Sequence, residues 1–323
     1  MAFRGEFTEL MTRDMYGWFM EAYDQLQPVY PQIFSVETID SAYLQVTEGI
    51  GLGQLTQRNE GDSIVASNPL EGYTVYGKAR TFSDAFYLTA EFVEDADPNK
   101  LANVMQGFAK TWAQGVINSK ETFAANFFNY GGYTAGNAIF NNTITGVISD
   151  PSGALIYTGK PFFALSGNNH PAKDGSTYYN SLGALNLTTA NLQTAYNLMT
   201  NTNNYDERGE KIMLSPDTLL IPPALRFTAR TILESELLPG GANNDKNVTQ
   251  NLVSQIEWQY LTDTDAWFLG QKGMGIKFIE RKMPVIDFYQ DEISKKYYAT
   301  IDARWGGTVS NWRYWVGANL STS

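Results

Sequence analysis

The sequence of 323 residues contains no cysteine and only one histidine, His170. Disulfides and thiolate metal sites are therefore excluded, and so is any mechanism that needs two histidines. No apolar signal core stands at the N-terminus. The long uncharged run of residues 122–149 is rich in Asn, Gly and Thr, whose polar groups would be stranded in lipid. We expect a protein without a membrane segment that is made and used in the cytoplasm.

Charge is also scarce, at 18% of residues, while aromatic residues reach 14%. Tyrosine and tryptophan favour interfaces because each has an apolar body and a polar tip, although a β-rich monomer is also rich in them. The net charge is −11, which does not attract nucleic acid. From Lys272 onward, however, eight basic residues outnumber five acidic ones. Either copies of the chain contact one another head to tail, or the two charged faces are simply solvated.

Residues 1–45 are predicted to form a helical arm followed by an extended stretch. Apolar side chains recur at helical spacing from Leu10 to Tyr23, and Pro28 and Pro31 then prevent the helix from continuing. Packing of this arm on its own domain is the favoured interpretation, and packing on another subunit is the alternative.

Residues 50–93 are predicted to be β-structure, because apolar and polar side chains alternate from Tyr73 to Arg80 and again from Phe86 to Phe92. The stretch between residues 54 and 84 has less apolar material than a self-supporting hairpin needs, and isolated hairpins are marginally stable. We expect this stretch to lie on another surface.

Residues 97–129 give the clearest prediction, a long helix. Asp97 is a suitable N-cap, Pro98 suits the first helical position, and Gly131 follows the last apolar residue of the stripe. The remaining predicted elements follow in chain order. They are short strands with loops (133–187), a helix (189–200), a strand that two prolines stop (217–221), a helix (224–237), a polar loop (239–251) and C-terminal strands (276–280, 297–305 and 312–316).

Local motifs for chemistry are weak. The glycines of residues 49–53 lack both a following helix and the Lys-Ser/Thr of a phosphate-binding loop. The acidic pairs 263/265 and 291/292 are typical of solvated turns rather than cation sites. Ser166 and His170 lack a partner carboxylate, so His170 is expected to be an ordinary loop residue. The Asn-x-Ser/Thr matches at 141, 186, 247 and 319 are expected by chance.

Two segments resemble the major capsid proteins of tailed bacteriophages, among them the Mu-like head subunits. They are Leu214–Leu225 (LSPDTLLIPPAL) and Tyr297–Gly307 (YYATIDARWGG), and the order of the predicted elements agrees with them. The resemblance implies an α+β fold with an N-terminal arm, an extended β loop, a long spine helix in a peripheral domain and an α/β axial domain. The implied boundaries are 1–49 for the arm, 50–85 for the extended loop, 86–130 with 276–323 for the peripheral domain, and 131–275 for the axial domain.

The resemblance also implies a structural subunit, not an enzyme, that assembles into the icosahedral head shell enclosing phage DNA. The implied partners are further copies in hexamers and pentamers, a portal, decoration proteins and double-stranded DNA held by non-specific contact. Many relatives carry a long built-in scaffolding segment where this chain has a short one, so a separate scaffolding protein is expected. No cofactor or metal is implied, and the location is the virion, assembled in the host cytoplasm.

The extended loop is expected to clamp a neighbouring subunit, with Arg58, Lys78 and Arg80 meeting acidic surface and Tyr73 and Tyr76 supplying contact area. Two other functions stay open. One is a bacterial nanocompartment shell protein of the same fold, and the other is a carboxylate-dependent hydrolase whose two acidic residues meet only in the folded chain.

Some relatives join a lysine of this loop to an asparagine of a neighbour, assisted by a buried glutamate. Here Lys78 is the one lysine of the loop, and Asn311 and Asn319 are C-terminal candidates. A lysine must lose its proton before it attacks, which needs desolvation beside a carboxylate base, and Lys78 has only Gly77 and Ala79 as neighbours. We therefore expect a shell held without covalent cross-links.

Overall fold

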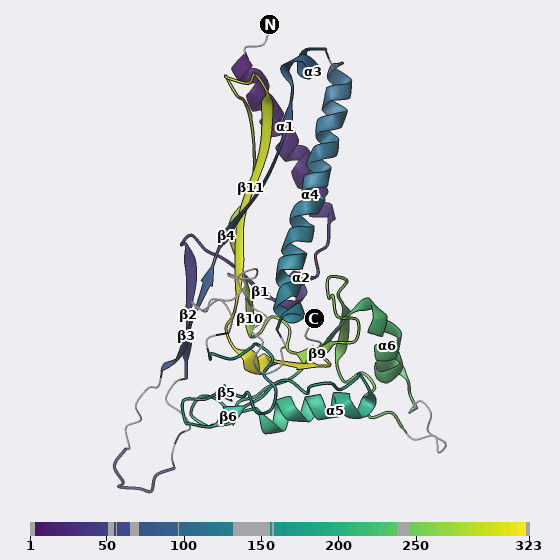
Figure 1. Ribbon diagram of the computed structural model, residues 1–323. Helices are drawn as coiled ribbons and strands as arrows, with labels where there is room; N and C mark the ends of the chain where they lie inside the picture. Colours follow the sequence, from purple (N-terminus) through teal and green to yellow (C-terminus); the bar gives the residue numbers. More distant parts are fainter. Residues whose placement is uncertain are drawn as a thin grey trace.

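The computed structural model describes residues 4–50, 55, 57–64, 71–95, 97–131, 156, 158–237 and 246–320. The molecule is elongated, with a narrow part and a broad part (Figure 1). The narrow part holds one four-stranded sheet beside helices α1 and α4, and the broad part holds a second four-stranded sheet beside helices α5 and α6. The N-terminus lies at the far end of the narrow part, and the C-terminus lies near the junction of the two parts.

Helix α4 (Pro98–Asn129) runs the length of the narrow part and confirms the helix predicted at 97–129. Its 32 residues span about 48 Å at 1.5 Å per residue. The apolar stripe packs against the rest of the narrow part because burying it stabilises the helix more than intrinsic propensity does. Its buried members are Leu101, Met105, Trp112, Val116, Phe123 and Phe127.

The sheet of the narrow part has the strand order β1-β10-β11-β4. These strands are β1 (Ser35–Thr38), β10 (Ile276–Gln290), β11 (Tyr297–Val309) and β4 (Arg80–Leu88). Strand β10 continues ten residues beyond the predicted end at Glu280. Two register shifts between Glu280, Lys282 and Val285 make this possible, because they leave Pro284, which has no amide hydrogen, outside the ladder.

The predicted β-structure up to Phe92 is wrong at its end. Strand β4 stops at Leu88, and helix α3 (Ala90–Asp95) follows. The hydroxyl of Thr89 accepts a hydrogen bond from the amide of Phe92 at 3.3 Å, so Thr89 caps the helix. Alternation of side chains could not reveal this cap.

The sheet of the broad part has the strand order β12-β9-β7-β8. These strands are β12 (Trp315–Ala318), β9 (Trp267–Gly270), β7 (Thr218–Ile221) and β8 (Ser254–Glu257). After β7, a 3-10 turn (Pro223–Leu225) leads into α6 (Arg226–Glu234), which confirms the strand–proline–helix unit but is shorter than the predicted 224–237.

Strand β12 pairs with β9 in this broad sheet, whereas the resemblance had placed all of 276–323 in the peripheral domain. Trp315 lies opposite Gly270, and its ring occupies the space where a side chain on Gly270 would stand. The last segment of the chain is therefore divided between the two sheets.

Helix α5 (Thr189–Asn197) confirms the helix predicted at 189–200 and continues as a π-helical turn (Leu198–Thr202). The side chain of Thr188 accepts a hydrogen bond from the amide of Asn191 and caps its start. Nearby, β5 (His170–Pro171) and β6 (Thr177–Tyr178) form a short hairpin.

The N-terminal arm packs on its own chain, as favoured from the sequence. Helix α1 (Arg4–Gln25) contacts both α4 and β10, and its Met15 and Phe19 are fully buried. The short helix α2 (Tyr30–Ile33) follows. The next segment, β2 (Tyr43–Gly49), pairs with β3 (Glu71–Lys78), so the paired β-structure begins before residue 50.

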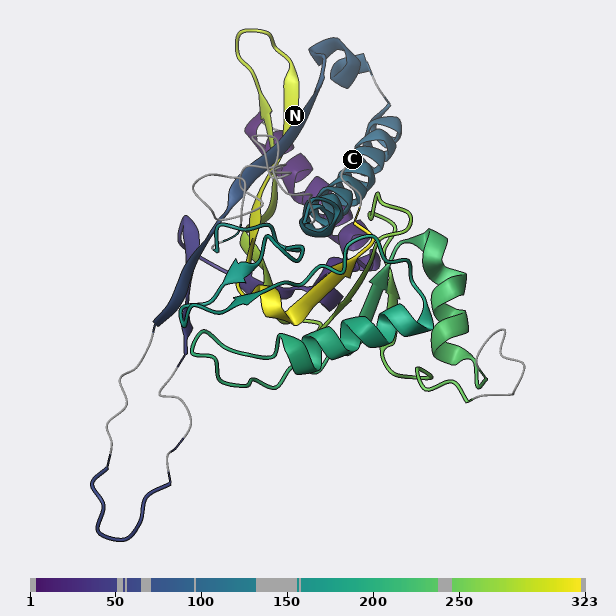
Figure 2. The same cartoon turned by 60° about the horizontal axis from the view of Figure 1, so that its bottom comes forward.

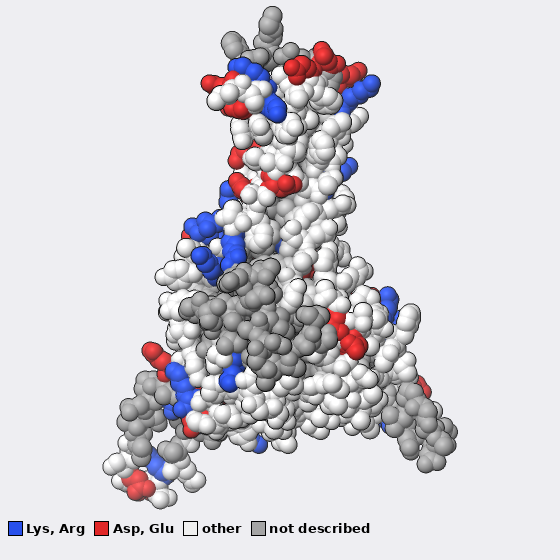
Figure 3. All heavy atoms as spheres, in the orientation of Figure 1, with Lys and Arg blue, Asp and Glu red and all other residues white. Residues whose placement is uncertain are grey.

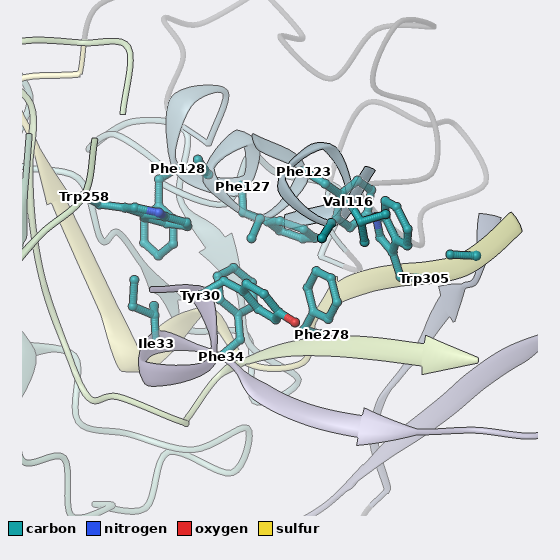
Figure 4. Packing of buried hydrophobic residues seen from close by; sticks show 14 of the residues in the cluster. Tyr30, Ile33, Phe34, Val116, Phe123, Phe127, Phe128, Trp258, Phe278 and Trp305 are labelled. Carbon is teal, nitrogen blue, oxygen red and sulfur yellow. The ribbon is translucent and has the colours of Figure 1, made fainter. Parts of the chain in front are cut away.

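The core at the junction of the two parts is largely aromatic (Figure 4). The ring of Phe34 lies edge-on to those of Phe127 and Phe278, and Phe128 packs against Trp258 and Trp315. Rings from α4, β10 and the segment after α2 therefore interlock there. A second apolar cluster fills the broad part between α5, α6 and the sheet.

Two adjacent charged residues of α4 connect the arm to this core. Lys120 lies 2.6 Å from a carboxylate oxygen of Glu280 in β10 and donates a hydrogen bond to the hydroxyl of Tyr23 at 2.9 Å. The hydroxyl of Tyr30 donates to the same Glu280 oxygen at 3.1 Å. Glu121 accepts hydrogen bonds from the amides of Val29 and Tyr30 and from the indole of Trp258.

Candidate intersubunit surfaces

The first candidate surface is the β2–β3 ribbon, meaning strands β2 and β3 with the segment between them. Along β3 the side chains alternate as predicted: Val75 and Ala79 are buried, while Thr74, Tyr76 and Lys78 are exposed. The buried side rests on β11. Gly306 lies so close to the backbone of Lys78 that a side chain there would collide with it. The inner half of β3 is therefore a fixed part of the subunit.

The described tip of the ribbon, residues 57–64, lies far from both sheets (Figures 1 and 2). It forms a turn in which the Arg58 guanidinium donates to the carbonyl of Asp62 at 2.8 Å and the Asn59 amide donates to the Asp62 carboxylate at 3.1 Å. Gly61 has a φ of +91°, which favours glycine. Leu55 and Ile64, on either side of the turn, are almost fully exposed.

The structure separates the five predicted contact residues. Arg58 belongs to the tip, whereas Tyr76, Lys78 and Arg80 are exposed near the base of the ribbon. The ring of Tyr76 lies edge-on to that of Tyr43 at 5.9 Å between ring centroids. Tyr73 is half-buried, and its hydroxyl donates to the carbonyl of Pro171 at 3.3 Å, so part of its surface is already covered within the subunit.

The second candidate surface is the distal end of the narrow part, where the β10–β11 turn lies near α3. Ile293 at the turn is almost fully exposed, and the Lys296 ammonium lies over the ring of Tyr87 at 4.3 Å. Hydrogen bonds from Ser294 hold the pKa of Asp291 below its usual value and fix the turn. Carboxylates gather on the α3 side of this end, while lysines and carboxylates mix on the turn side (Figure 3).

The third candidate surface lies on the broad part. Phe227 projects from the outer face of α6, because the opposite face, with Ala229, Ile232 and Leu233, is buried. Met213 and Val248 are also exposed on loops of this part. A contiguous patch of exposed apolar side chains is typical of a surface that a partner covers, whereas single exposed ones are common on any protein.

His170 does not form a catalytic pair with Ser166, and it is not the ordinary loop residue that the sequence predicted. It lies in β5, is fully buried and stacks on Trp312 at 4.2 Å between ring centroids. Its ring nitrogens contact the hydroxyl of Thr158 at 2.8 Å and the side-chain oxygen of Asn180 at 3.3 Å. Burial lowers the pKa of His170 to about 3, so the ring is neutral.

The groups considered for a covalent link are engaged elsewhere. The side chain of Asn311 accepts a hydrogen bond from the amide of Arg313, and the side chain of Asn319 donates to that of Asn186 at 2.9 Å. Among the described residues, the buried glutamates Glu121 and Glu207 both have partners within the chain. Lys78 is exposed, which leaves its ammonium hydrated.

Acidic clusters give no metal site in the described part of the chain, where no group of three or more potential ligands converges. A hydrogen bond to the carboxyl of Asp263 raises the pKa of Asp265 above its usual value. None of the described helices is both long and apolar enough to cross a membrane.

A family model described as phage capsid protein matches residues 72–318. No curated protein matches the sequence. Among solved structures, the mature capsid of bacteriophage PhiM1 is similar at 9% identity and a TM-score of 0.53, covering 93% of this chain and 89% of that one. The capsid of the native GTA particle is 12% identical with a TM-score of 0.51, covering 91% and 90%.

The capsid of bacteriophage JBD30 is 15% identical with a TM-score of 0.52, covering 73% of this chain and 92% of that one. None of these likenesses selects a subfamily, so the Mu-like assignment stays a prediction. The likenesses to solved capsids agree on the fold, and the family model spans most of the sequence. The chain therefore belongs to the phage capsid protein family, and its α+β structure is the tailed-phage capsid fold.

Proposed function

We propose that this capsid protein assembles into the closed icosahedral head shell of a tailed phage and encloses double-stranded DNA. The observation that carries the proposal is a pair of almost fully exposed apolar residues, Leu55 and Ile64, at the tip of a ribbon far from the subunit core. Burying such side chains against a neighbour is favourable by about 25 cal/mol per Å². An isolated subunit gains nothing from exposing them.

In the proposed shell, the clamp is the part of residues 50–85 that precedes β4, because Arg80 and the residues after it pair with β11. The peripheral and axial domains follow the boundaries implied by the resemblance, except that β12 joins the axial sheet. Arg58 at the tip meets acidic surface of a neighbour, while Tyr76, Lys78 and Arg80 line the base. Each exposed charge pair contributes only about 0–1 kcal/mol. Stability then arises because every subunit makes many such contacts at once.

The distal end supplies a second contact between copies. Lys295 and Lys296 of one subunit face the carboxylates of Glu91 and Asp95 on α3 of the next, and Ile293 packs beside Phe92. This arrangement is heterologous, since two different patches meet, and heterologous contacts close into rings. The carboxylates on the α3 side of this end, and the lysines among the mixed charges on its turn side, support this contact (Figure 3).

The other proposed partners are a separate scaffolding protein, a portal, decoration proteins and packaged DNA bound without sequence preference. The protein is proposed to assemble in the host cytoplasm and to remain in the virion, without enzymatic activity.

Electron microscopy of the expressed protein, alone and with its scaffolding protein, tests the proposal. Closed shells are expected, and a chain that stays monomeric at high concentration with the scaffold present would contradict it. Uniform shells that form without portal or DNA and retain a cargo protein would instead favour a nanocompartment.

The ribbon has its own test, a Leu55→Ser and Ile64→Ser double variant. Because both residues are exposed, the unassembled subunit should unfold at the same urea concentration as wild type, while its shells should dissociate at lower temperature. Glu60→Gln is the matched control at the tip. A double variant with shells as heat-stable as the control would rule out the clamp.

A further inference from the structure

The side chain of Lys173 ties the first residues of β3 to the broad part of the subunit. Its ammonium donates hydrogen bonds to the carbonyls of Glu71 at 2.5 Å and Gly72 at 2.8 Å, and it lies 5.3 Å from the centre of the Tyr73 ring. These are the first three residues of β3. One cation therefore holds two backbone carbonyls and one aromatic face at the point where the ribbon leaves the subunit body.

The loop that carries Lys173 is itself held from the interior. The backbone amide of Lys173 donates to one carboxylate oxygen of Glu207 at 2.9 Å, and the other oxygen lies 2.8 Å from the guanidinium of Arg313. Glu207 and Arg313 are almost fully buried, and Arg313 also donates to the carbonyl of Tyr205 at 2.7 Å. A chain of polar contacts thus runs from the core of the broad part to the first residues of β3.

A second attachment holds the other end of β3. There Gly77 packs against Ile279 and Thr308, and Gly306 lies against the backbone of Lys78. These contacts fix where β3 meets the narrow part, and the Lys173 contacts fix where it meets the broad part. Two attachments on one strand determine the direction of that strand, which neither could determine alone.

We propose that Lys173 is a positioning residue that sets the direction in which the β2–β3 ribbon leaves the subunit, and hence where its tip meets a second copy of the chain. The inference rests on the proposed role of the ribbon as an intersubunit clamp. The chain reaches β3 from the tip through residue 71, so the attachment at 71–73 sets the direction of the described strand nearest the tip.

Hydrogen exchange on the unassembled full-length subunit tests the attachment directly. In Lys173→Met, which keeps a chain of similar length without the charge, amides of residues 71–75 should exchange about three- to fivefold faster, as expected for losing contacts of a partly exposed ammonium. Amides of β10 and β11 should be unchanged. Lys173→Arg should restore slow exchange, and Lys110→Met, at an exposed site on α4, is the matched control.

Electron microscopy of assembled Lys173→Met then tests the consequence. Shells of mixed size or open sheets are expected where wild type forms uniform shells. Unchanged exchange at residues 71–75, or faster exchange with uniform shells, would overturn the positioning role. If instead the Leu55→Ser and Ile64→Ser variant assembles into heat-stable shells, the clamp fails, and the exchange result still decides the attachment.

Discussion

The ion pair between Lys120 and Glu280 should be costly to break from either side, but not equally so. The two side chains are 2% and 18% exposed, respectively. Glu280→Gln leaves a buried ammonium without a counter-charge, and breaking a buried pair in this way costs roughly 3–5 kcal/mol. Lys120→Met leaves a carboxylate that reaches water and still accepts the Tyr30 hydroxyl, so we expect about 1–3 kcal/mol.

The Tyr30 hydroxyl is protonated and donates in wild type and in Lys120→Met, because burial, together with the charge of Glu280, raises the pKa of Tyr30 above its usual range. Replacing both residues, as Lys120→Met with Glu280→Met, removes the charges together and fills the space with apolar atoms. The double variant should therefore lie within about 2 kcal/mol of wild type, less than the sum of the two single changes.

Urea unfolding of the unassembled subunit, followed by tryptophan fluorescence, measures these free energies. Trp305 is a nearby reporter, since the Lys120 ammonium lies 5.8 Å from its ring. Glu234→Gln is the control, because the exposed Arg230–Glu234 pair should contribute less than about 0.5 kcal/mol. A Glu280→Gln variant that is more stable than Lys120→Met would refute the reasoning from burial.

Three further predictions concern pH, packing and cross-linking. The pKa of His170 is about 3 in the folded subunit, below its value in the unfolded chain. The contribution of His170 to the free energy of unfolding should therefore be fully present above pH 6.5 and be lost as the pH drops toward 3. The free energies of unfolding from urea titrations at pH 7 and 5 should therefore differ by about 2 kcal/mol more in wild type than in His170→Asn. Gly306→Val should push β3 off β11 and destabilise the subunit by about 1–3 kcal/mol, measured by thermal unfolding, whereas an unchanged midpoint would show that the strands can separate freely. Boiled particles should run as one band near 36 kDa on a denaturing gel, and a ladder of multimers would reveal covalent links.

The elements that the sequence predicted well are those whose burial has a simple period. The stripe from Leu101 to Phe127 predicted α4 to within one residue, and Pro222 with Pro223 marked the junction of β7 and α6. In both cases neighbours in the sequence decide the structure. The end of β10 could not be predicted in this way, because the ladder tolerates Pro284 only through register shifts set by its partner strand.

The candidate surfaces were predicted in part. Alternation along β3 separated the exposed Tyr76 and Lys78 from the buried Val75, but it gave no sign that Tyr73 contacts Pro171 across a gap of 98 residues. Lys173 and His170 were missed for the same reason. Their partners, Glu71 and Trp312, are distant in sequence, and neither residue stands in a motif that marks a long-range contact.

The aromatic content, which composition alone linked to interfaces, is divided by residue type in the folded chain. No tryptophan is exposed: five of the seven are fully buried, Trp112 is 8% exposed and Trp18 is half-buried. The narrow part is a single sheet beside its helices, so few residues have neighbours on all sides, and large rings supply the most contact per residue. Phe82 stacks on Trp305 with ring centroids 4.0 Å apart, and Phe86 packs on Trp112.

Tyrosines, by contrast, are exposed at the ribbon and at the distal end, where Tyr43, Tyr76, Tyr87 and Tyr289 lie. Trp112 and Trp305 therefore stabilise the narrow part itself, and in the proposed shell these tyrosines and the exposed aliphatic residues are the side chains left for contact between subunits.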